Sequence, residues 1–243
     1  MGVDLYFTLG ELDPADVQNR TVVVVDVLRA TSTIVEALAN GARAIYPTTG
    51  TEEAIKLISS LGRDDTLLCG ERRGLKIEGY DLGNSPAEFT REKVDGKRIV
   101  MNTTNGTQAL VAVAGADRVF TGSFMNLSAV AKAVAGTDDL TVVCAGRGGR
   151  FSLDDAVCAG AILARLGTEW ANDSDTSDAA RVALQLATHA TVDAAFLAET
   201  AGGRNLVEIG MEADLELCAT VDRHVLAPAM VDGTIRLLPG KGP

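Results

Sequence analysis

Aromatic residues are scarce in this chain of 243 residues, since Phe, Trp and Tyr make up only 4% of it. This scarcity argues against a binding surface built from aromatic rings and favours close packing of helices on a sheet. The four cysteines (Cys69, Cys144, Cys158 and Cys218) form no C-x-x-C motif and no short-range pair. We therefore expect reduced thiols, which are typical of a cytoplasmic protein.

The chain also lacks a long apolar run and a basic tract. No run approaches the roughly 18 apolar residues that cross a bilayer, and the first ten residues are too polar for a signal peptide, so we expect no membrane partner. The formal net charge is −11. Without a basic tract that releases counterions, we expect no nucleic-acid partner.

Strand-like and helix-like patterns alternate along the first two thirds of the chain, where several strand-like runs are apolar throughout, as in strands covered on both faces. The strand-like runs are 3–9, 21–27, 42–48, 66–70, 97–102, 117–122 and 140–146. The helix-like runs are 31–40, 51–61, 105–114, 126–135 and 152–166. This alternation predicts an α/β fold with three layers, α/β/α, around a largely parallel or mixed sheet.

After Gly167 the pattern changes to an acidic loop and then to helical runs at 177–189, 191–200 and 212–222. Asp232-Gly233 stands between two short apolar runs, which predicts a β-hairpin at the end of the chain. We expect one domain over residues 1–243. The helical third, residues 167–243, is either a cover on that domain or a small subdomain.

Polar segments follow four of the predicted strands. They are DVLRATST (26–33), GERRGLKIEGYDLGNSP (70–86), TTNGTQ (103–108) and AGRGGRFSLDD (145–155). Ligands of parallel α/β sheets bind beyond the carboxyl ends of the strands. We therefore expect all four segments to converge at one edge of the sheet.

The same segments suit anion binding. Three hydroxyl residues, 31–33, exceed what one N-cap needs, and a helix N-terminus with spare donors attracts anions, although simple capping explains part of the pattern. Asn105-Gly106-Thr107 fits either a hairpin turn or a strand-to-helix loop, and the helix-like run that follows favours the loop. Arg147, Arg150 and the glycines between them suit bidentate binding of phosphate or sulfonate.

Carboxylates share this edge with the anion-binding residues, namely Asp26, Glu71, Asp81, Asp154 and Asp155. A cation between them resolves the conflict, and Mg²⁺ is the usual one, since it takes one or two carboxylates and then substrate oxygens. The alternative is Arg–carboxylate pairing, of Asp26 with Arg29 and of Glu71 with Arg72 or Arg73.

Two further functions remain open. Cys144 and Arg150 have the spacing of metal-free cysteine phosphatases, whose thiolate attacks phosphorus, although Phe151 stands where Ser or Thr is usual. The chain could also be a non-catalytic protein that binds an anion or a nucleotide. No G-x-x-x-x-G-K-[ST] or G-x-G-x-x-G follows any strand, which weakens the nucleotide version.

Together, DVLRATST, GYDLGNSP, TTNGTQAL and CAGRGGRFSLDDAVCAGA resemble the 2-phosphosulfolactate phosphatases of coenzyme M biosynthesis, with a looser similarity in ADLELCATVD. The resemblance implies an α/β/α phosphatase that uses Mg²⁺ to hydrolyse 2-phospho-3-sulfolactate to 3-sulfolactate and phosphate. Two positions depart from the family pattern, Arg73 for a small residue and Asp154 for Glu.

We therefore expect a cytoplasmic phosphatase of a small anionic phosphoester. A homodimer is the base-rate expectation for its assembly, because dimers are the commonest oligomers. Asp26, Glu71 and Asp155 are the expected metal ligands or water activators, with Arg29 as a further catalytic residue, and Asp26 is alternatively a nucleophile. The expected substrate-binding residues are Thr31, Ser32, Asn84, Ser85, Thr104, Asn105, Gly106, Thr107, Cys144, Gly146 and Arg150.

Overall fold

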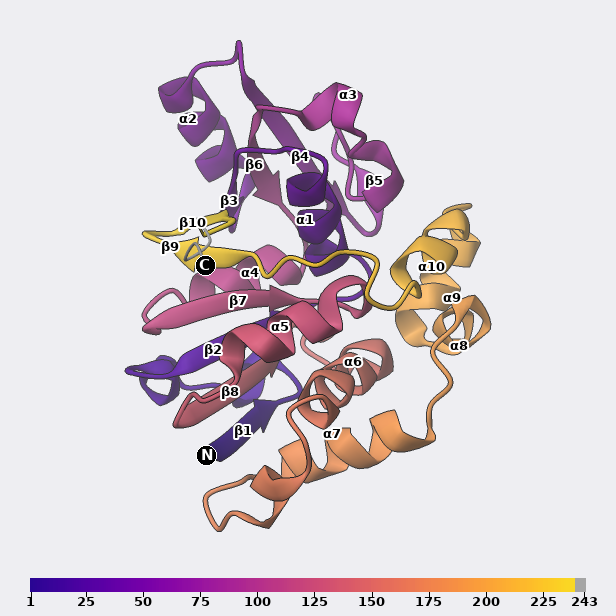
Figure 1. The fold of residues 1–243 in the computed structure, drawn as a ribbon. Coiled ribbons are helices and arrows are strands. Elements are labelled where there is room, and N and C mark those ends of the chain that lie inside the picture. Colours follow the sequence, from indigo (N-terminus) through magenta and orange to yellow (C-terminus); the bar gives the residue numbers. More distant parts are fainter. Residues whose placement is uncertain (239–243) are drawn as a thin grey trace.

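A mixed sheet runs through the computed structural model, which describes residues 1–238 (Figure 1). Within these residues the sheet has ten strands in the order β1-β8-β2-β7-β9-β10-β3-β6-β4-β5. The strands are β1 (Gly2–Tyr6), β2 (Thr21–Val25), β3 (Ala44–Thr48), β4 (Thr66–Arg72), β5 (Leu75–Lys76), β6 (Arg98–Asn102), β7 (Arg118–Gly122), β8 (Asp139–Cys144), β9 (Ala229–Val231) and β10 (Thr234–Arg236).

The sheet consists of two parallel sets joined by a hairpin. In one set β1, β8, β2 and β7 are parallel, and in the other β3, β6 and β4 are parallel. The hairpin β9–β10 lies between them and pairs antiparallel with β7 and with β3. Its turn residues, Asp232 and Gly233, both have positive φ, as a two-residue type I′ turn requires. The predicted C-terminal hairpin is confirmed.

The two parallel sets approach each other at their carboxyl ends for a reason that the sequence did not indicate. Three antiparallel steps separate β7 from β3, so in a flat sheet the two sets would point in opposite directions. Each strand pair adds a twist of roughly 20–25°. Figure 1 shows the resulting steep angle between β7 and β6. The mixed sheet is therefore as predicted, and the four loops converge, but they follow two parallel sets rather than one common edge of the sheet.

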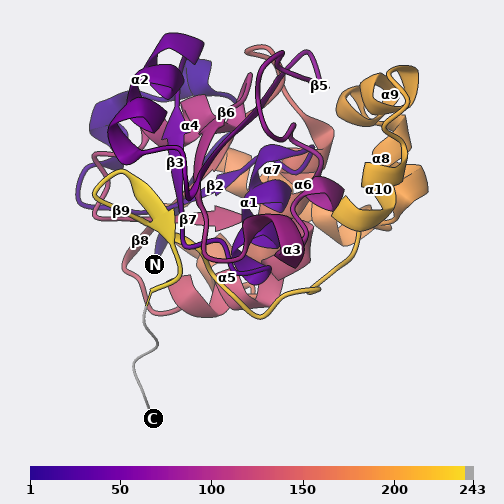
Figure 2. The same cartoon turned by 90° about the horizontal axis from the view of Figure 1, so that it is seen from above.

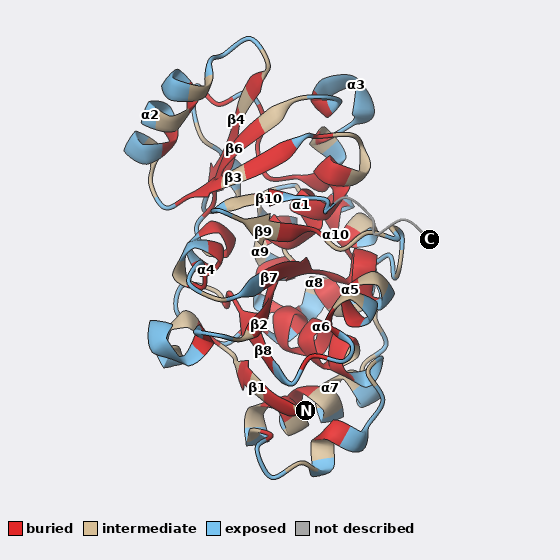
Figure 3. Cartoon of the chain, turned by 60° about the vertical axis from the view of Figure 1, so that its left-hand side comes forward, coloured by how far each residue is buried: buried red, intermediate tan, exposed pale blue. Residues whose placement is uncertain are grey.

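Helices cover both faces of the sheet, which confirms the three-layer prediction. They are α1 (Ala30–Ala39), α2 (Thr51–Leu61), α3 (Arg91–Val94), α4 (Gly106–Ala112), α5 (Leu127–Val134), α6 (Leu153–Ala164), α7 (Asp178–His189), α8 (Ala194–Glu199), α9 (Ala201–Glu208) and α10 (Ala213–Cys218). Alternate residues of β2 separate the layers: Val23 and Val25 pack towards α5 and α6, whereas Val22 and Val24 pack towards α1 and α4. Figure 3 shows this buried central layer.

The C-terminal helices pack into the core that β1, β2 and β8 share, through Leu197, Leu206 and Leu215. Figure 2 shows α8, α9 and α10 together at one end of the molecule, away from the β9–β10 hairpin. An extended segment, residues 221–228, connects α10 to β9 along α1 and α5 (Figure 1). These helices therefore stand next to the loops that follow β2 and β4.

Helix α9 was not predicted, because two glycines at its start disfavour a helix. Tertiary packing explains them: a Cβ on Gly203 would come within 1.8 Å of the Leu197 carbonyl oxygen, so only glycine fits. The short elements α3 and β5 were also missed. No helix in residues 1–238 is both long and apolar enough to span a membrane.

Candidate active site

A cavity of about 500 Å³ opens where the two parallel sets meet. All four polar segments singled out in the sequence contribute to its wall, through Asp26 and Arg29, through Glu71, Arg73 and Asn84, through Thr104 and Asn105, and through Arg147 and Arg150. Helix α9 closes a further side with Gly202 and Asn205. The cavity therefore brings together residues from both halves of the sheet and from the C-terminal helices.

Asp26 lies at the carboxyl end of β2 with only 6% of its surface exposed. Its Oδ1 accepts a hydrogen bond of 3.1 Å from the Ala30 amide. A Cβ on Gly106 would lie 2.6 Å from Asp26 Oδ2, so glycine there lets the start of α4 approach this carboxylate. Burial, with the charges of Glu71 and Asp154, raises the pKa of Asp26 to about 7 against the opposing effects of Ala30 and Arg29.

Glu71 lies near the end of β4 and is also buried. Its two carboxylate oxygens accept backbone hydrogen bonds of 2.7 Å from Gly74 and from Thr104. Neighbouring Arg72 donates to the Glu71 backbone carbonyl and to Asn102, and makes no bond to the Glu71 carboxylate. Glu71 thus ties the β4–β5 turn to the loop after β6.

Arg29 pairs with Asp214 of α10 rather than with Asp26. Its Nη1 lies 2.8 Å from Asp214 Oδ2, with both side chains almost fully buried, and its Nη2 donates to the Gly74 carbonyl. Asp214 also accepts a 2.5 Å hydrogen bond from Ser85 Oγ. The Arg–carboxylate pairing considered for Asp26 and Glu71 is therefore wrong. Asp214 was not among the predicted site residues, although ADLELCATVD contained it.

Three further arginines reach the cavity without a carboxylate partner. Arg73 lies on the turn between β4 and β5, and Arg147 and Arg150 pair through their backbones in the loop after β8. None of the three forms an ion pair with any residue between 1 and 238. Their guanidinium groups are therefore available for anionic groups of a ligand.

The hydroxyl residues after the strands lie behind the cavity wall. Thr31 Oγ1 donates to the Asp26 carbonyl and accepts from the Asp26 amide, and Ser32 Oγ donates to the Val27 carbonyl. Thr107 Oγ1 bonds with Thr103. All of these side chains are fully buried and, like Gly106 and Ser85, are absent from the wall. The structure gives them a role in shaping the loops.

Asp155 and Gly146 also lie outside the wall. Asp155 accepts hydrogen bonds from the Val27 amide at 2.8 Å and from the Gly146 amide at 3.1 Å, which holds the loops after β2 and β8 together. Burial and the charges of Asp154 and Asp26 raise the pKa of Asp155 well above its usual value. Burial likewise raises the pKa of Asp154. The position of Asp155 does not match the metal-ligand role expected for it.

Cys144 does not fit the role of a nucleophile. It is fully buried in β8 and absent from the cavity wall. Burial, followed by the charge of Asp155, raises the pKa of its thiol well above the usual value, which is the reverse of an activated cysteine. The geometry therefore argues against the metal-free cysteine mechanism.

The donor set of the cavity suits a hard divalent cation. Asp26 and Glu71 are the carboxylates in its wall, and residues 1–238 contain no cluster of three His, Cys, Asp or Glu side chains able to hold a metal. Mg²⁺ commonly binds through one or two carboxylates and completes its shell with water and substrate oxygens. The two carboxylates fit that pattern. The described residues do not form a site in which side chains alone supply every metal ligand.

Comparison with known proteins gives consistent matches. The model of the family described as 2-phosphosulpholactate phosphatase matches residues 6–233. A protein of Caldanaerobacter subterraneus subsp. tengcongensis is 41% identical over 97% of this chain and 98% of its own length. A protein of Thermotoga petrophila is 41% identical over 91% and 93%, and one of Clostridium beijerinckii 35% identical over 97% and 99%. Each is named "Probable 2-phosphosulfolactate phosphatase".

Proposed function

Because the chain belongs to the 2-phosphosulfolactate phosphatase family, we propose that it hydrolyses 2-phospho-3-sulfolactate to 3-sulfolactate and phosphate in the presence of Mg²⁺. The reaction class, hydrolysis of a phosphoric monoester, and the substrate are those in the names of its relatives. The dependence on Mg²⁺ is our inference from the carboxylates in the cavity.

The balance of charges in the cavity is the observation that carries the proposal. Asp26 and Glu71 share the cavity with four arginines, of which only Arg29 has a carboxylate partner within the described residues 1–238. 2-Phospho-3-sulfolactate has a phosphate, a sulfonate and a carboxylate on three carbons. A ligand with one anionic group would leave most of these guanidinium groups without a counter-charge, whereas a ligand with three matches them.

We assign the proposed role of each arginine from its position in the cavity. The anionic substituents would be held, and the phosphoryl group oriented, by Arg73 from the β4–β5 turn and by Arg147 and Arg150 from the loop after β8. Arg29, fixed by Asp214, would stabilise the charge that develops on the phosphoryl oxygens, together with donors from the loop that contains Thr104 and Asn105.

Asp26 and Glu71 would hold the cation, and Glu71 is oriented for this by the two amides that it accepts. A bound Mg²⁺ would supply neutralisation of the phosphate charge and activation of water. Thr31, Ser32 and Asp155 fix the backbone around Asp26, so that its carboxylate keeps one position while the substrate changes.

Phosphate release tests the proposal directly. The protein is assayed with 2-phospho-3-sulfolactate, with phospholactate, which lacks the sulfonate, and with a simple alkyl phosphate, each with Mg²⁺ and with excess EDTA. We expect release that needs Mg²⁺ and falls in that order of substrates.

Release that survives EDTA would contradict the metal dependence. Equal rates on all three compounds would contradict the assignment of the arginines to the additional anionic groups. No release from any compound would contradict the proposed function and favour an anion-binding protein, whose ligand would then raise the unfolding temperature without turnover.

A further inference from the structure

The side-chain amide of Asn84 has an oxygen without a partner. Asn84 is 4% exposed and lies in the cavity wall. Its Oδ1 is buried and forms no hydrogen bond within the described part of the chain. Its backbone, in contrast, is firmly held, because its carbonyl accepts a 2.8 Å hydrogen bond from Thr33 Oγ1 of α1. A buried carbonyl-type oxygen is normally satisfied, so its missing partner points to a ligand.

A backbone contact joins the segment that contains Asn84 to the end of β4. Cys69 of β4 pairs in parallel with Leu82, and the Gly70 amide donates to the Leu82 carbonyl. Glu71 directly follows Gly70, and Asn84 follows Leu82 by two residues. Both residues line the same cavity, so the Asn84 side chain and the Glu71 carboxylate are available to one ligand.

Asp26 completes a group of three oxygen-bearing side chains. Asp26 Oδ2 faces Gly106, where a Cβ would lie 2.6 Å away, and Glu71 Oε1 accepts a 2.7 Å hydrogen bond from the Thr104 amide, so both carboxylates contact the same short loop. Arg29, the cation next to them in the sequence, is committed to Asp214 and to the Gly74 carbonyl. Three side chains that offer acceptor oxygens therefore line one cavity, and within residues 1–238 neither of the two carboxylates forms an ion pair.

We propose that the Asn84 side-chain oxygen is a neutral third ligand of the divalent cation held by Asp26 and Glu71. Hard cations accept amide oxygens as readily as they accept water, and a neutral ligand adds selectivity without adding to the repulsion between the carboxylates. This inference rests on the proposed metal-dependent function, and its test is made on cation binding in the absence of substrate.

The experiment measures Mn²⁺ binding to the full chain by electron paramagnetic resonance and by calorimetry, with Mg²⁺ as competitor. The variants are Asn84→Ala, Asn84→Asp and, as a matched control, Asn205→Ala, which removes the same side chain from the α9 wall of the same cavity. Far-UV circular dichroism of the cation-free proteins confirms that each variant is folded.

We expect Asn84→Ala to weaken Mn²⁺ binding roughly 10-fold or more, and Asn84→Asp, which keeps the oxygen and adds a charge, to tighten it by a similar factor. Asn205→Ala should bind as the wild type does. If Asn84 instead donated its NH₂ group to the substrate, both Asn84 variants would bind Mn²⁺ normally, and that result would overturn the inference alone. A wild-type protein that binds no Mn²⁺ would overturn the inference and the proposed metal dependence together.

Discussion

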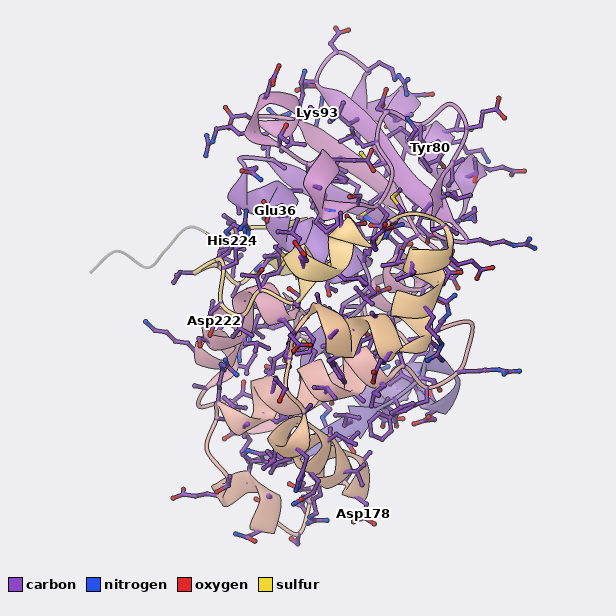
Figure 4. All side chains as sticks on the ribbon, turned by 90° about the vertical axis from the view of Figure 1, so that its right-hand side faces the viewer. Glu36, Tyr80, Lys93, Asp178, Asp222 and His224 are labelled. Carbon is purple, nitrogen blue, oxygen red and sulfur yellow. The ribbon has the colours of Figure 1, made fainter. Side chains whose placement is uncertain are left out.

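Two buried carboxylates near α1 have opposite electrostatic surroundings. Glu36 lies in α1 and receives a 3.1 Å bond from Arg223 Nε, with His224 Nε2 at 2.7 Å, so that the segment after α10 is fixed to the helix (Figure 4). Burial opposes the ionised form of Glu36, but these bonds outweigh it and hold its pKa below the usual value. Asp26, just before α1, has only the Ala30 amide, and its pKa rises to about 7.

The comparison distinguishes a charged group that stabilises the fold, Glu36, from one that is available to a ligand, Asp26. The cluster of Glu36, Arg223 and His224 satisfies itself, and nothing in it is left for a substrate. At the cavity, Asp26 has no cationic partner, and the exposed Arg73 and Arg150 have no anionic one, among residues 1–238. An unpaired buried carboxylate such as Asp26 costs stability, so its presence in a folded chain points to a function that uses it.

The largest effect is expected from Asp26→Asn, which keeps the acceptor for the Ala30 amide and removes the charge. Activity on 2-phospho-3-sulfolactate should fall by roughly 100-fold or more, since a charged group at the reacting phosphate is lost. The cation-free protein should unfold at a higher temperature, by roughly 2–4 °C for each kcal/mol of repulsion relieved. Phosphate release and calorimetry measure the two effects. A variant that loses stability would show that Asp26 is paired, like Glu36.

The next effect concerns the buried pair of Arg29 and Asp214. Asp214→Asn leaves Arg29 buried without a counter-charge, which costs about 3–5 kcal/mol of unfolding free energy. The turnover number should fall more than the Michaelis constant rises, because Arg29 loses its orientation. Ser85→Ala is the matched control, since it removes only the hydrogen bond to Asp214 and costs about 1 kcal/mol. Equal losses in the two variants, measured by urea unfolding, would argue against an ion pair that fixes Arg29.

Local patterns in the sequence were sufficient for most of the fold. The continuous apolar run of β2 predicted a strand covered on both faces, and Asp232-Gly233 predicted the hairpin, because both signals depend only on neighbouring residues. The antiparallel insertion of that hairpin between β7 and β3 was not predictable, since strand order is set by contacts between distant segments. Helix α9 was missed because the packing that requires its glycines is tertiary.

The site was predictable as a set of loops but less so residue by residue. Position at a strand end indicated that the segments with Asp26, Glu71, Thr104 and Arg150 would meet, and all four residues line the cavity. Position at a strand end did not predict whether a side chain faces the cavity or the protein interior. Thr31 and Asp155 form hydrogen bonds with backbone groups of the loop after β2 instead of facing the cavity. The ion-pair partner of Arg29 lies 185 positions away in the sequence.

A smaller effect is expected from the unpaired arginines. Arg73→Ala or Arg150→Ala should lower kcat/KM for 2-phospho-3-sulfolactate roughly 10-fold, the lower end of the range for a bond to a charged group. Unfolding free energy should change by less than about 0.5 kcal/mol, because no protein partner is lost. Arg204→Ala is the control, since this exposed arginine of α9 lies outside the cavity wall. An equal loss of kcat/KM with a simple alkyl phosphate would show that these arginines do not bind the sulfonate or the carboxylate.

The smallest effect is expected from Glu36→Gln, which makes the same neutral change in the self-satisfied cluster. The folded pKa of Glu36 is lowered, so its contribution is present above the unfolded pKa of about 4.3 and is lost as the pH falls through the folded pKa. At pH 7 the variant should lose about 1 kcal/mol, a modest value because Arg223 is partly exposed and its charge is screened. Below the folded pKa the two proteins should unfold alike, and phosphate release should be unchanged throughout.

Denaturant unfolding at a series of pH values measures the difference in unfolding free energy between the wild type and Glu36→Gln. A loss of stability that persists in acid would show that packing, rather than charge, causes it. Opposite signs for Asp26→Asn and Glu36→Gln at neutral pH would establish that pairing, and not burial, distinguishes the two carboxylates.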